Sequence, residues 1–178
     1  VVGWIGGWVS GLYLLESYPP EMQQEMLAQG MTDTKIALTM AIQSATYGLV
    51  LGAAGIWLGK KVGLWKDERH ITKKPLLAAL VISLIGGLGI ILPDLLFFGK
   101  YEPALLDTYA VKPTIPYLLA TVTYGAVIEE VMMRLFLMSL VAFVLHLLFE
   151  RKRMEVSTAV LVAANVVSAL LFAAGHLP

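Results

Sequence analysis

Long stretches without charge dominate this sequence, and they restrict it to folds that a lipid bilayer can surround. Residues 36–59 contain no Asp, Glu, Lys or Arg, and residues 75–99 contain only Asp94. A helix needs about 20 apolar residues to cross the ~30 Å hydrocarbon core of a bilayer. Residues 156–178 form another uncharged segment of that length, and residues 1–15 form a shorter one. We therefore expect transmembrane helices.

A fifth apolar segment, residues 117–149, is longer than one span requires and holds three ionisable residues in its interior: Glu129, Glu130 and Arg134. Only helices and closed barrels satisfy their backbone polar groups inside a membrane, and no alternating strand pattern is present. The five segments therefore predict an all-α, polytopic bundle of about five spans. We expect residues 1–178 to form a single transmembrane domain.

The composition agrees with a membrane protein and excludes several other classes. Hydrophobic residues make up 58% of the 178 residues and charged residues 15%, against roughly 45–50% and ~25% in soluble domains. The 13 basic and 13 acidic residues give a formal net charge of zero, so no net positive field favours nucleic acid. Because Cys is absent, disulfides, thiolate zinc sites and cysteine nucleophiles are excluded.

Basic residues segregate into two of the connecting loops. Nine of the 13 lie in segments 60–74 and 151–153, whereas the other two connectors, 16–35 and 100–116, hold six acidic and three basic residues. Loops rich in Lys and Arg stay in the cytoplasm, so we place the two basic loops there. This alternation requires residues 117–149 to cross the membrane once.

Two smaller patterns predict local structure. Pro20, a run of apolar and polar residues and then Gly30 predict a short interfacial helix with Pro in its first turn and Gly after its end. Small residues four apart let helix backbones approach closely. This spacing occurs at Gly3, Gly7 and Gly11, at Gly48 and Gly52, and at Gly55 and Gly59.

The charged residues inside segment 117–149 require a partner or a wet cavity, because an ionisable side chain at bilayer depth costs about 2.5–3.5 kcal/mol on insertion scales. Glu130 and Arg134 are four residues apart, so a helix brings their carboxylate and guanidinium together. Glu129 is turned ~100° away from that pair. A structural ion pair needs only one Glu, so the second indicates a functional carboxylate available as a general base.

His176 also lies in an apolar segment, and helix geometry places it level with the glutamates. Glu129 lies 21 residues before Glu150, and His176 lies 21 residues after Glu155. At ~1.5 Å rise per residue, each is about 31 Å from the same loop. Helices joined by a short connector are antiparallel neighbours. We therefore expect the imidazole and the carboxylates to meet.

Other polar or adaptable residues are weaker candidates. A partly polar stripe along the last helix consists of Asn165, Ser168, Phe172 and His176, at helical spacing. Asp94 follows Pro93 near the end of its span, where a kink lets the carboxylate reach water. The methionines at positions 132, 133 and 138 are typical of gap-filling core.

Two motifs in these helices resemble the first two motifs of the CPBP family, which comprises intramembrane CAAX prenyl endopeptidases and bacteriocin-processing or immunity (Abi) proteins. The first is Glu-Glu-x-x-x-Arg at 129–134, and the second is Phe-x-x-x-His at 172–176. The third family motif, a His followed four residues later by Asn or Asp, is absent. Because the chain begins at Val1 and stops at Pro178 within apolar runs, we expect it to be truncated at both ends.

This resemblance implies an intramembrane protease in which Glu129 activates a water for attack on a peptide carbonyl. His176 would position or polarise that water, or would bind a metal together with Glu129 if a metal is present. Glu130 and Arg134 would hold the site together, and Phe172 would shape the pocket. The resemblance allows both a metalloprotease, with a divalent metal such as zinc, and a metal-free glutamate enzyme, so the cofactor stays open.

The implied substrate is a prenylated or otherwise membrane-presented peptide or protein, in contact with lipid, in a bacterial or archaeal cell membrane. Two other functions stay open. A proton-coupled transporter would use Glu129, Glu130 and His176 as a relay, and it predicts further ionisable residues through the depth of the bundle. A catalytically silent immunity or interaction protein would keep the same residues for packing.

Overall fold

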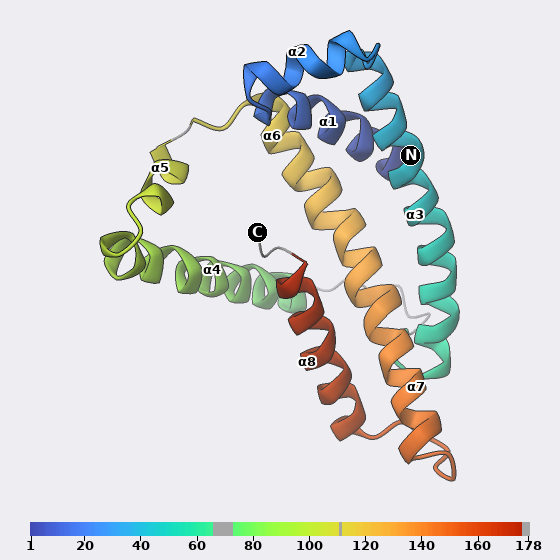
Figure 1. The fold of residues 1–178 in the computed structure, drawn as a ribbon. Coiled ribbons are helices and arrows are strands. Elements are labelled where there is room, and N and C mark those ends of the chain that lie inside the picture. Colours follow the sequence, from blue (N-terminus) through green and yellow to red (C-terminus); the bar gives the residue numbers. More distant parts are fainter. Residues whose placement is uncertain (66–72, 111, 176–178) are drawn as a thin grey trace. The chain divides into compact units, whose positions relative to one another are not determined.

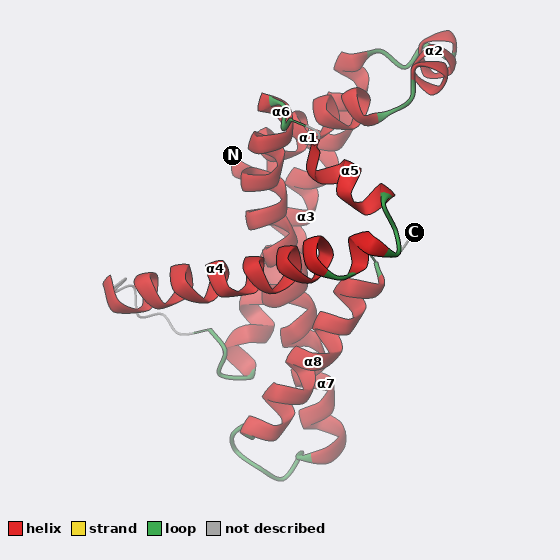
Figure 2. Ribbon diagram, turned by 90° about the vertical axis from the view of Figure 1, so that its left-hand side faces the viewer, coloured by secondary structure: helices red, strands yellow, loops and turns green. Residues whose placement is uncertain are grey.

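The computed structural model describes residues 1–65, 73–110 and 112–175, and every regular element in these ranges is helical (Figure 2). The all-α prediction is confirmed. The chain divides into two compact units, one formed by Val1–Lys66 with Thr114–Pro178 and the other by Asp67–Pro113. Residues 66–72, within the first basic loop, lie outside the described residues.

The larger unit contains two short helices, one long N-terminal helix and the helices that carry the predicted motifs. The N-terminal elements are α1 (Val2–Ser17), α2 (Pro20–Ala28) and α3 (Asp33–Lys61) (Figure 1). A continuous helix, Ile115–Phe149, follows in this unit, and then α8 (Thr158–Ala174). The short helix predicted from Pro20 is confirmed as α2, and Gly30 after it has a positive φ of 75°.

The long helix Ile115–Phe149 changes its winding around the ionisable residues. It consists of α6 (Ile115–Ala120), η2 (Thr121–Glu129), η3 (Val131–Met138) and α7 (Ser139–Phe149). The segments η2 and η3 are π-helical, and Glu130 lies between them. The sequence predicted α-helical geometry throughout this segment, whereas i→i+5 hydrogen bonding widens the helix on both sides of Glu130. Wide turns of this kind occur frequently at functional sites.

Small residues bring α1 into close contact with α3, as their spacing predicted. A Cβ atom on Gly11 would lie 2.6 Å from Cα of Ala37, and one on Gly7 would overlap the backbone of Met40 and Ala41. Ala37 and Ala41 are completely buried. The contact therefore depends on glycine at these positions of α1.

Both N-terminal helices also support the long helix. A Cβ atom on Gly6 of α1 would lie 3.1 Å from the backbone of Thr123 in η2, and one on Gly55 of α3 would lie 2.8 Å from the backbone of Leu135 in η3. These two glycines let backbone pack directly on backbone. The segment with the ionisable residues thus has close backbone contacts with both α1 and α3.

A tight connection joins α7 to α8, which returns antiparallel beside α7 and η3 (Figure 1). The Glu150 carboxylate accepts a hydrogen bond from the backbone N–H of Ser157 at 3.0 Å, and Arg153 lies 3.4 Å from the other carboxylate oxygen. Hydrogen bonds from Ser157, assisted by Arg153 and His146, hold the pKa of Glu150 below its usual value. The predicted antiparallel pairing of the last two helices is therefore confirmed.

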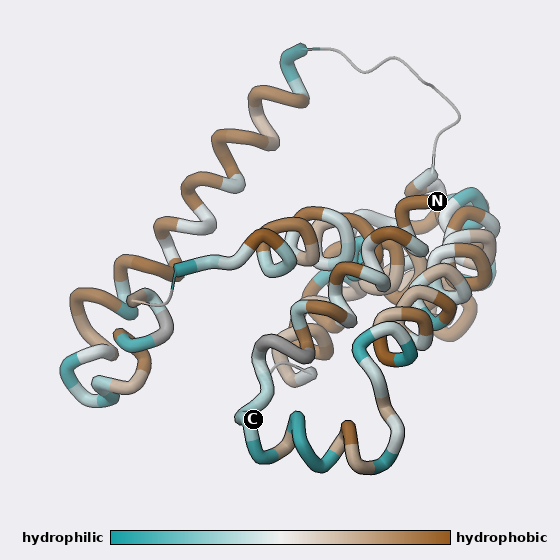
Figure 3. The backbone as a smooth tube through the Cα atoms, turned by 90° about the horizontal axis from the view of Figure 1, so that it is seen from above, coloured by the Kyte–Doolittle hydropathy of each residue, from teal (hydrophilic) through white to brown (hydrophobic). Residues whose placement is uncertain are grey.

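Within the described ranges, three helices are long and apolar enough to cross a membrane: Asp33–Lys61, Lys73–Lys100 and Ile115–Phe149. The sequence predicted about five spans. Two of the predicted spans correspond to shorter helices, since α1 has 16 residues and the described part of the last segment forms the 17-residue α8. Figure 3 shows the apolar stretches of the helices and the hydrophilic segments that join them.

The smaller unit contains α4 (Lys73–Leu96), the short helix η1 (Phe98–Lys100) and α5 (Ala104–Ala110). Tyr109 of α5 donates a hydrogen bond to the Asp94 carboxylate at 2.6 Å. This bond to a carboxylate raises the pKa of Tyr109. The sequence predicted that Asp94 reaches water at a Pro kink, and it did not reveal this side-chain partner.

Candidate active site

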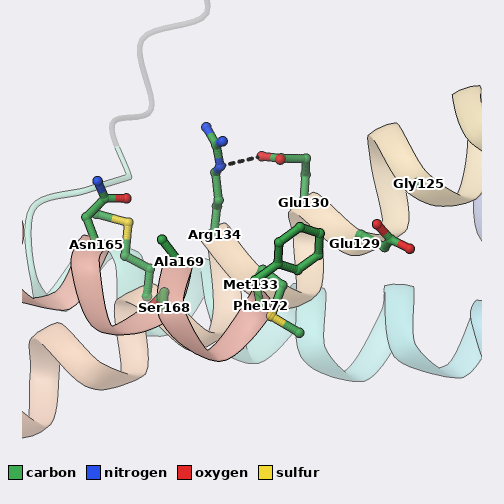
Figure 4. A pocket seen from close by; sticks show the side chains of 10 residues that line it. Gly125, Glu129, Glu130, Met133, Arg134, Asn165, Ser168, Ala169 and Phe172 are labelled. Carbon is green, nitrogen blue, oxygen red and sulfur yellow. Dashed lines mark ion pairs between the residues drawn. The ribbon is translucent and has the colours of Figure 1, made fainter. Parts of the chain in front are cut away.

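Residues of the long helix and α8 surround a cavity of about 170 Å³ within the larger unit (Figure 4). A space of this size holds several water molecules. The long helix contributes Gly125, Glu129, Glu130, Met133, Arg134 and Met138, and α8 contributes Asn165, Ser168, Ala169 and Phe172. The residues of the first motif and Phe172, the first residue of the second motif, therefore line one cavity.

Glu130 and Arg134 form the predicted ion pair. Arg134 Nε lies 2.9 Å from Glu130 Oε2, as marked by the dashed line in Figure 4. The pair leaves much of both side chains exposed, 51% of Glu130 and 73% of Arg134. Because the two charges compensate each other, an ionised Glu129 is the remaining charge among the residues that line the cavity.

Glu129 lies at the end of the cavity near Gly125, apart from the ion pair (Figure 4). Its Oε2 atom is 3.9 Å from the position that a Cβ on Gly125 would take. Glycine one turn earlier therefore leaves open space beside this carboxylate. Glu129 itself is half-buried. A carboxylate in this setting can accept a proton from a water molecule in the cavity.

Phe172 of α8 lines the same cavity as Glu129. This agrees with the distances along the two helices that the sequence predicted. Phe172 is the first residue of the second motif and lies four residues before His176 in the sequence. The cavity wall therefore includes the first residue of this motif. His176 lies outside the described residues. Its position level with Glu129 stays a prediction.

Four lining residues were not identified as site residues from the sequence: Gly125, Met133, Met138 and Ala169. Gly125 leaves space beside the carboxylate of Glu129. Met133 and Met138 were interpreted as gap-filling core; both are partly buried, Met138 packs against the core around Ala142 and Ala164, and both also line the cavity. Their spacing after Glu129, four and nine residues, was the available signal, since it fits one face of a widened helix.

A second cavity of about 360 Å³ borders the same ion pair. Its lining combines mainly apolar residues with the pair itself: Leu64, Trp65, Glu130, Val131, Arg134, Leu135 and Ser139. Leu64 and Trp65 turn back onto the end of α3, where both backbone N–H groups donate to the Gly59 carbonyl at 2.9 and 3.0 Å.

Candidate metal ligands are few in the described part of the chain. No three His, Cys, Asp or Glu side chains come together there as a metal site would require. A catalytic zinc ion normally has three protein ligands and a water. The described residues therefore supply Glu129 but no complete ligand set, and His176 lies beyond them.

Residues 111–178 match the family model of type II CAAX prenyl endopeptidases, Rce1-like. The chain matches no curated protein and no solved structure. The matched segment covers the long helix and α8, the elements that surround the cavity. The match supports an intramembrane protease with a membrane-associated protein substrate, and it agrees with helices able to cross a membrane. The resemblance to the CPBP family is thus confirmed over residues 111–178, which are similar to the Rce1-like CAAX prenyl endopeptidases.

Proposed function

We propose that this chain carries the catalytic residues of a multi-pass intramembrane endopeptidase, which hydrolyses a peptide bond in a prenylated, membrane-associated substrate. The observation that carries the proposal is the cavity between the long helix and α8, where Glu129 lies beside a separately neutralised Glu130–Arg134 pair. An ionisable group at membrane depth is functional by default. The family match over the same helices adds the reaction class.

Glu129 acts as the general base in this proposal. Its carboxylate takes a proton from a water molecule, and the water oxygen attacks the carbonyl carbon of the scissile peptide bond. The resulting tetrahedral intermediate collapses as the C–N bond breaks, and the proton on Glu129 passes to the leaving amine. A positioned base contributes typically about 10²–10⁴-fold to such a reaction.

The Glu130–Arg134 pair explains why two glutamates are present. An unpaired guanidinium one turn from Glu129 would stabilise the carboxylate and weaken it as a base. Because Arg134 is bound to Glu130 at 2.9 Å, its charge is compensated by that neighbour. In this proposal, the pair supports the cavity wall and Phe172 shapes the space in which the substrate carbonyl lies.

His176 completes the proposed site from the end of the last apolar segment. Its imidazole would position the attacking water opposite Glu129. If a divalent metal such as zinc is bound, His176 and Glu129 are its candidate ligands, and the metal would supply polarisation of the water. In the proposed steps, the proton moves from water to Glu129 and then to the leaving amine, and no metal takes part in either transfer.

The second cavity suggests where a lipid group of the substrate would lie. Its apolar lining includes Leu64, Trp65 and Leu135. The Glu130–Arg134 pair lines both this cavity and the first one. A prenyl group placed there would leave its attached peptide close to Glu129. Burial of its apolar surface would favour binding.

A cleavage assay tests this function. The full chain is reconstituted in liposomes with a farnesylated peptide, and products are identified by mass spectrometry. We expect Glu129→Gln and His176→Ala each to reduce the cleavage rate by about 10²-fold or more. Glu25→Gln is the matched control, because Glu25 lies exposed on α2. Full cleavage by Glu129→Gln would overturn the proposal, and chelation with metal analysis would address the cofactor.

The same liposomes distinguish the two other functions. A proton-coupled transporter would move protons across the bilayer in a Glu129-dependent manner without releasing peptide products. A catalytically silent immunity protein would show neither activity, and Glu129→Gln would leave its biological effect intact.

A further inference from the structure

Ser168 of α8 has a buried hydroxyl that no contact in the fold explains. Its side chain lines the cavity that contains Glu129, and the residue is only 5% exposed. Among the described residues, its Oγ atom has no hydrogen-bond partner. A buried hydroxyl without a partner is unfavourable, so such a group invites an explanation in terms of a ligand.

Several helical hydroxyls elsewhere in the described part of the chain find a partner in their own helix. Four threonines donate to the carbonyl oxygen four residues earlier, at 2.6–2.9 Å: Thr39, Thr46, Thr121 and Thr123. The same acceptor is available to Ser168 in principle, yet its hydroxyl does not use it. Ser44 of α3 is also buried without a partner, but it does not line this cavity.

Asn165 extends this polar wall along α8. It lines the same cavity one turn before Ser168, and its amide offers both donors and an acceptor. Figure 4 shows Asn165 at one end, Glu129 at the other and Ser168 between them. The cavity thus has a carboxylate at one end, and two of the four residues that α8 contributes to its wall have uncharged hydrogen-bonding side chains.

The spacing of these groups fits an extended peptide. Ser168 is four residues from Phe172, which is about 6 Å along a helix. An extended chain advances about 3.3 Å per residue. A peptide that lies along α8 with its scissile bond near Phe172 would therefore bring a backbone carbonyl to Ser168 about two residues away.

We propose that Ser168 and Asn165 bind the main chain of the substrate, with Ser168 Oγ, which is inaccessible in this rotamer, rotating about the Cα–Cβ bond to donate to a peptide carbonyl about two residues from the scissile bond. The ligand is an extended peptide segment, recognised through its backbone rather than its side chains. This inference rests on the proposed function. It assigns peptide recognition to α8, whereas the catalytic base belongs to the long helix.

Peptide binding without turnover tests the inference. The full chain carrying Glu129→Gln is placed in lipid nanodiscs, and the Kd of a fluorescent farnesylated peptide is measured with and without Ser168→Ala. Loss of one hydrogen bond predicts about 3- to 10-fold weaker binding. In the protein with Glu129 intact, Ser168→Ala should raise KM by a similar factor with kcat little changed, and Asn165→Ala should act in the same direction.

Ser44→Ala is the matched control, since it removes an equally buried and unpartnered hydroxyl away from the cavity. Both Ser→Ala variants should keep or raise the thermal midpoint, because each deletes an unsatisfied polar atom. An unchanged Kd for Ser168→Ala, or an equal effect of Ser44→Ala, would overturn the inference and leave the proposed function intact. Full cleavage by Glu129→Gln, or no binding of the peptide to the protein at all, would instead overturn the proposed function and this inference with it.

Discussion

Substitution of Gly55 by Ala tests how the long helix is held in place. The added Cβ would lie 2.8 Å from the backbone carbonyl of Leu135, whereas ordinary contacts begin at 3.4 Å. The two backbones would have to separate by about 0.6 Å, the difference between these distances. Overpacking of this kind costs about 1–3 kcal/mol. We expect a lower free energy of unfolding, measured by thermal or denaturant unfolding of the purified protein in detergent.

Two glycines on the same helix provide the controls. A Cβ on Gly48 or Gly52 would lie 3.6 Å from a side-chain atom, of Ile128 and Val131 respectively. Ala at these positions fits without displacement, and its better helix propensity favours a neutral or slightly stabilising effect. If Gly55→Ala were as stable as the native protein, or if all three variants lost the same stability, the direct backbone contact with the long helix would be refuted.

Further predictions follow from single contacts. Hydrogen bonds from Ser157 lower the pKa of Glu150 from its ordinary 4.5. The ionised carboxylate therefore stabilises the fold above pH 4.5, and this contribution is lost as the pH falls through the lower folded-state pKa. Glu150→Gln should reduce the decrease of the thermal midpoint between about pH 7 and pH 3. A double-mutant cycle with Glu130→Gln and Arg134→Gln should give a coupling energy of about 0.5–3 kcal/mol in unfolding experiments, and strict additivity would argue against the pair. Gly125→Leu should fill the space beside the proposed base and lower kcat/KM in the peptide assay while the protein stays folded; unaltered kinetics would show that this space is not used.

The sequence predicted the elements that depend on composition and spacing. Long uncharged segments predicted the helices, and the four-residue spacing of Gly7 and Gly11 predicted a close helix–helix approach, whose partner the structure identifies as α3. The ion pair between Glu130 and Arg134 followed from one turn of helix. These features depend on local geometry, so neighbours in the sequence are sufficient to predict them.

Features that depend on distant segments or on backbone bonding were not predicted. The π-helical winding of η2 and η3 is a property of main-chain hydrogen bonds, and side-chain spacing does not reveal it. Tyr109 reaches Asp94 because a turn folds α5 back towards α4. Among the described residues, the Ser168 hydroxyl has no hydrogen-bond partner. This depends on the positions of all nearby acceptors, which the sequence does not give.

In the proposed active site, the long helix and the last apolar segment bring Glu129 and His176 together at one cavity. The chain contains no native Cys, so paired substitutions report on this distance directly. We predict that Glu129→Cys with His176→Cys is bridged by mercuric ion in the membrane, whereas Glu129→Cys with Asn165→Cys, at the opposite end of the cavity, is not. Failure of the first pair to bridge, or bridging of the second pair with equal efficiency, would contradict the account.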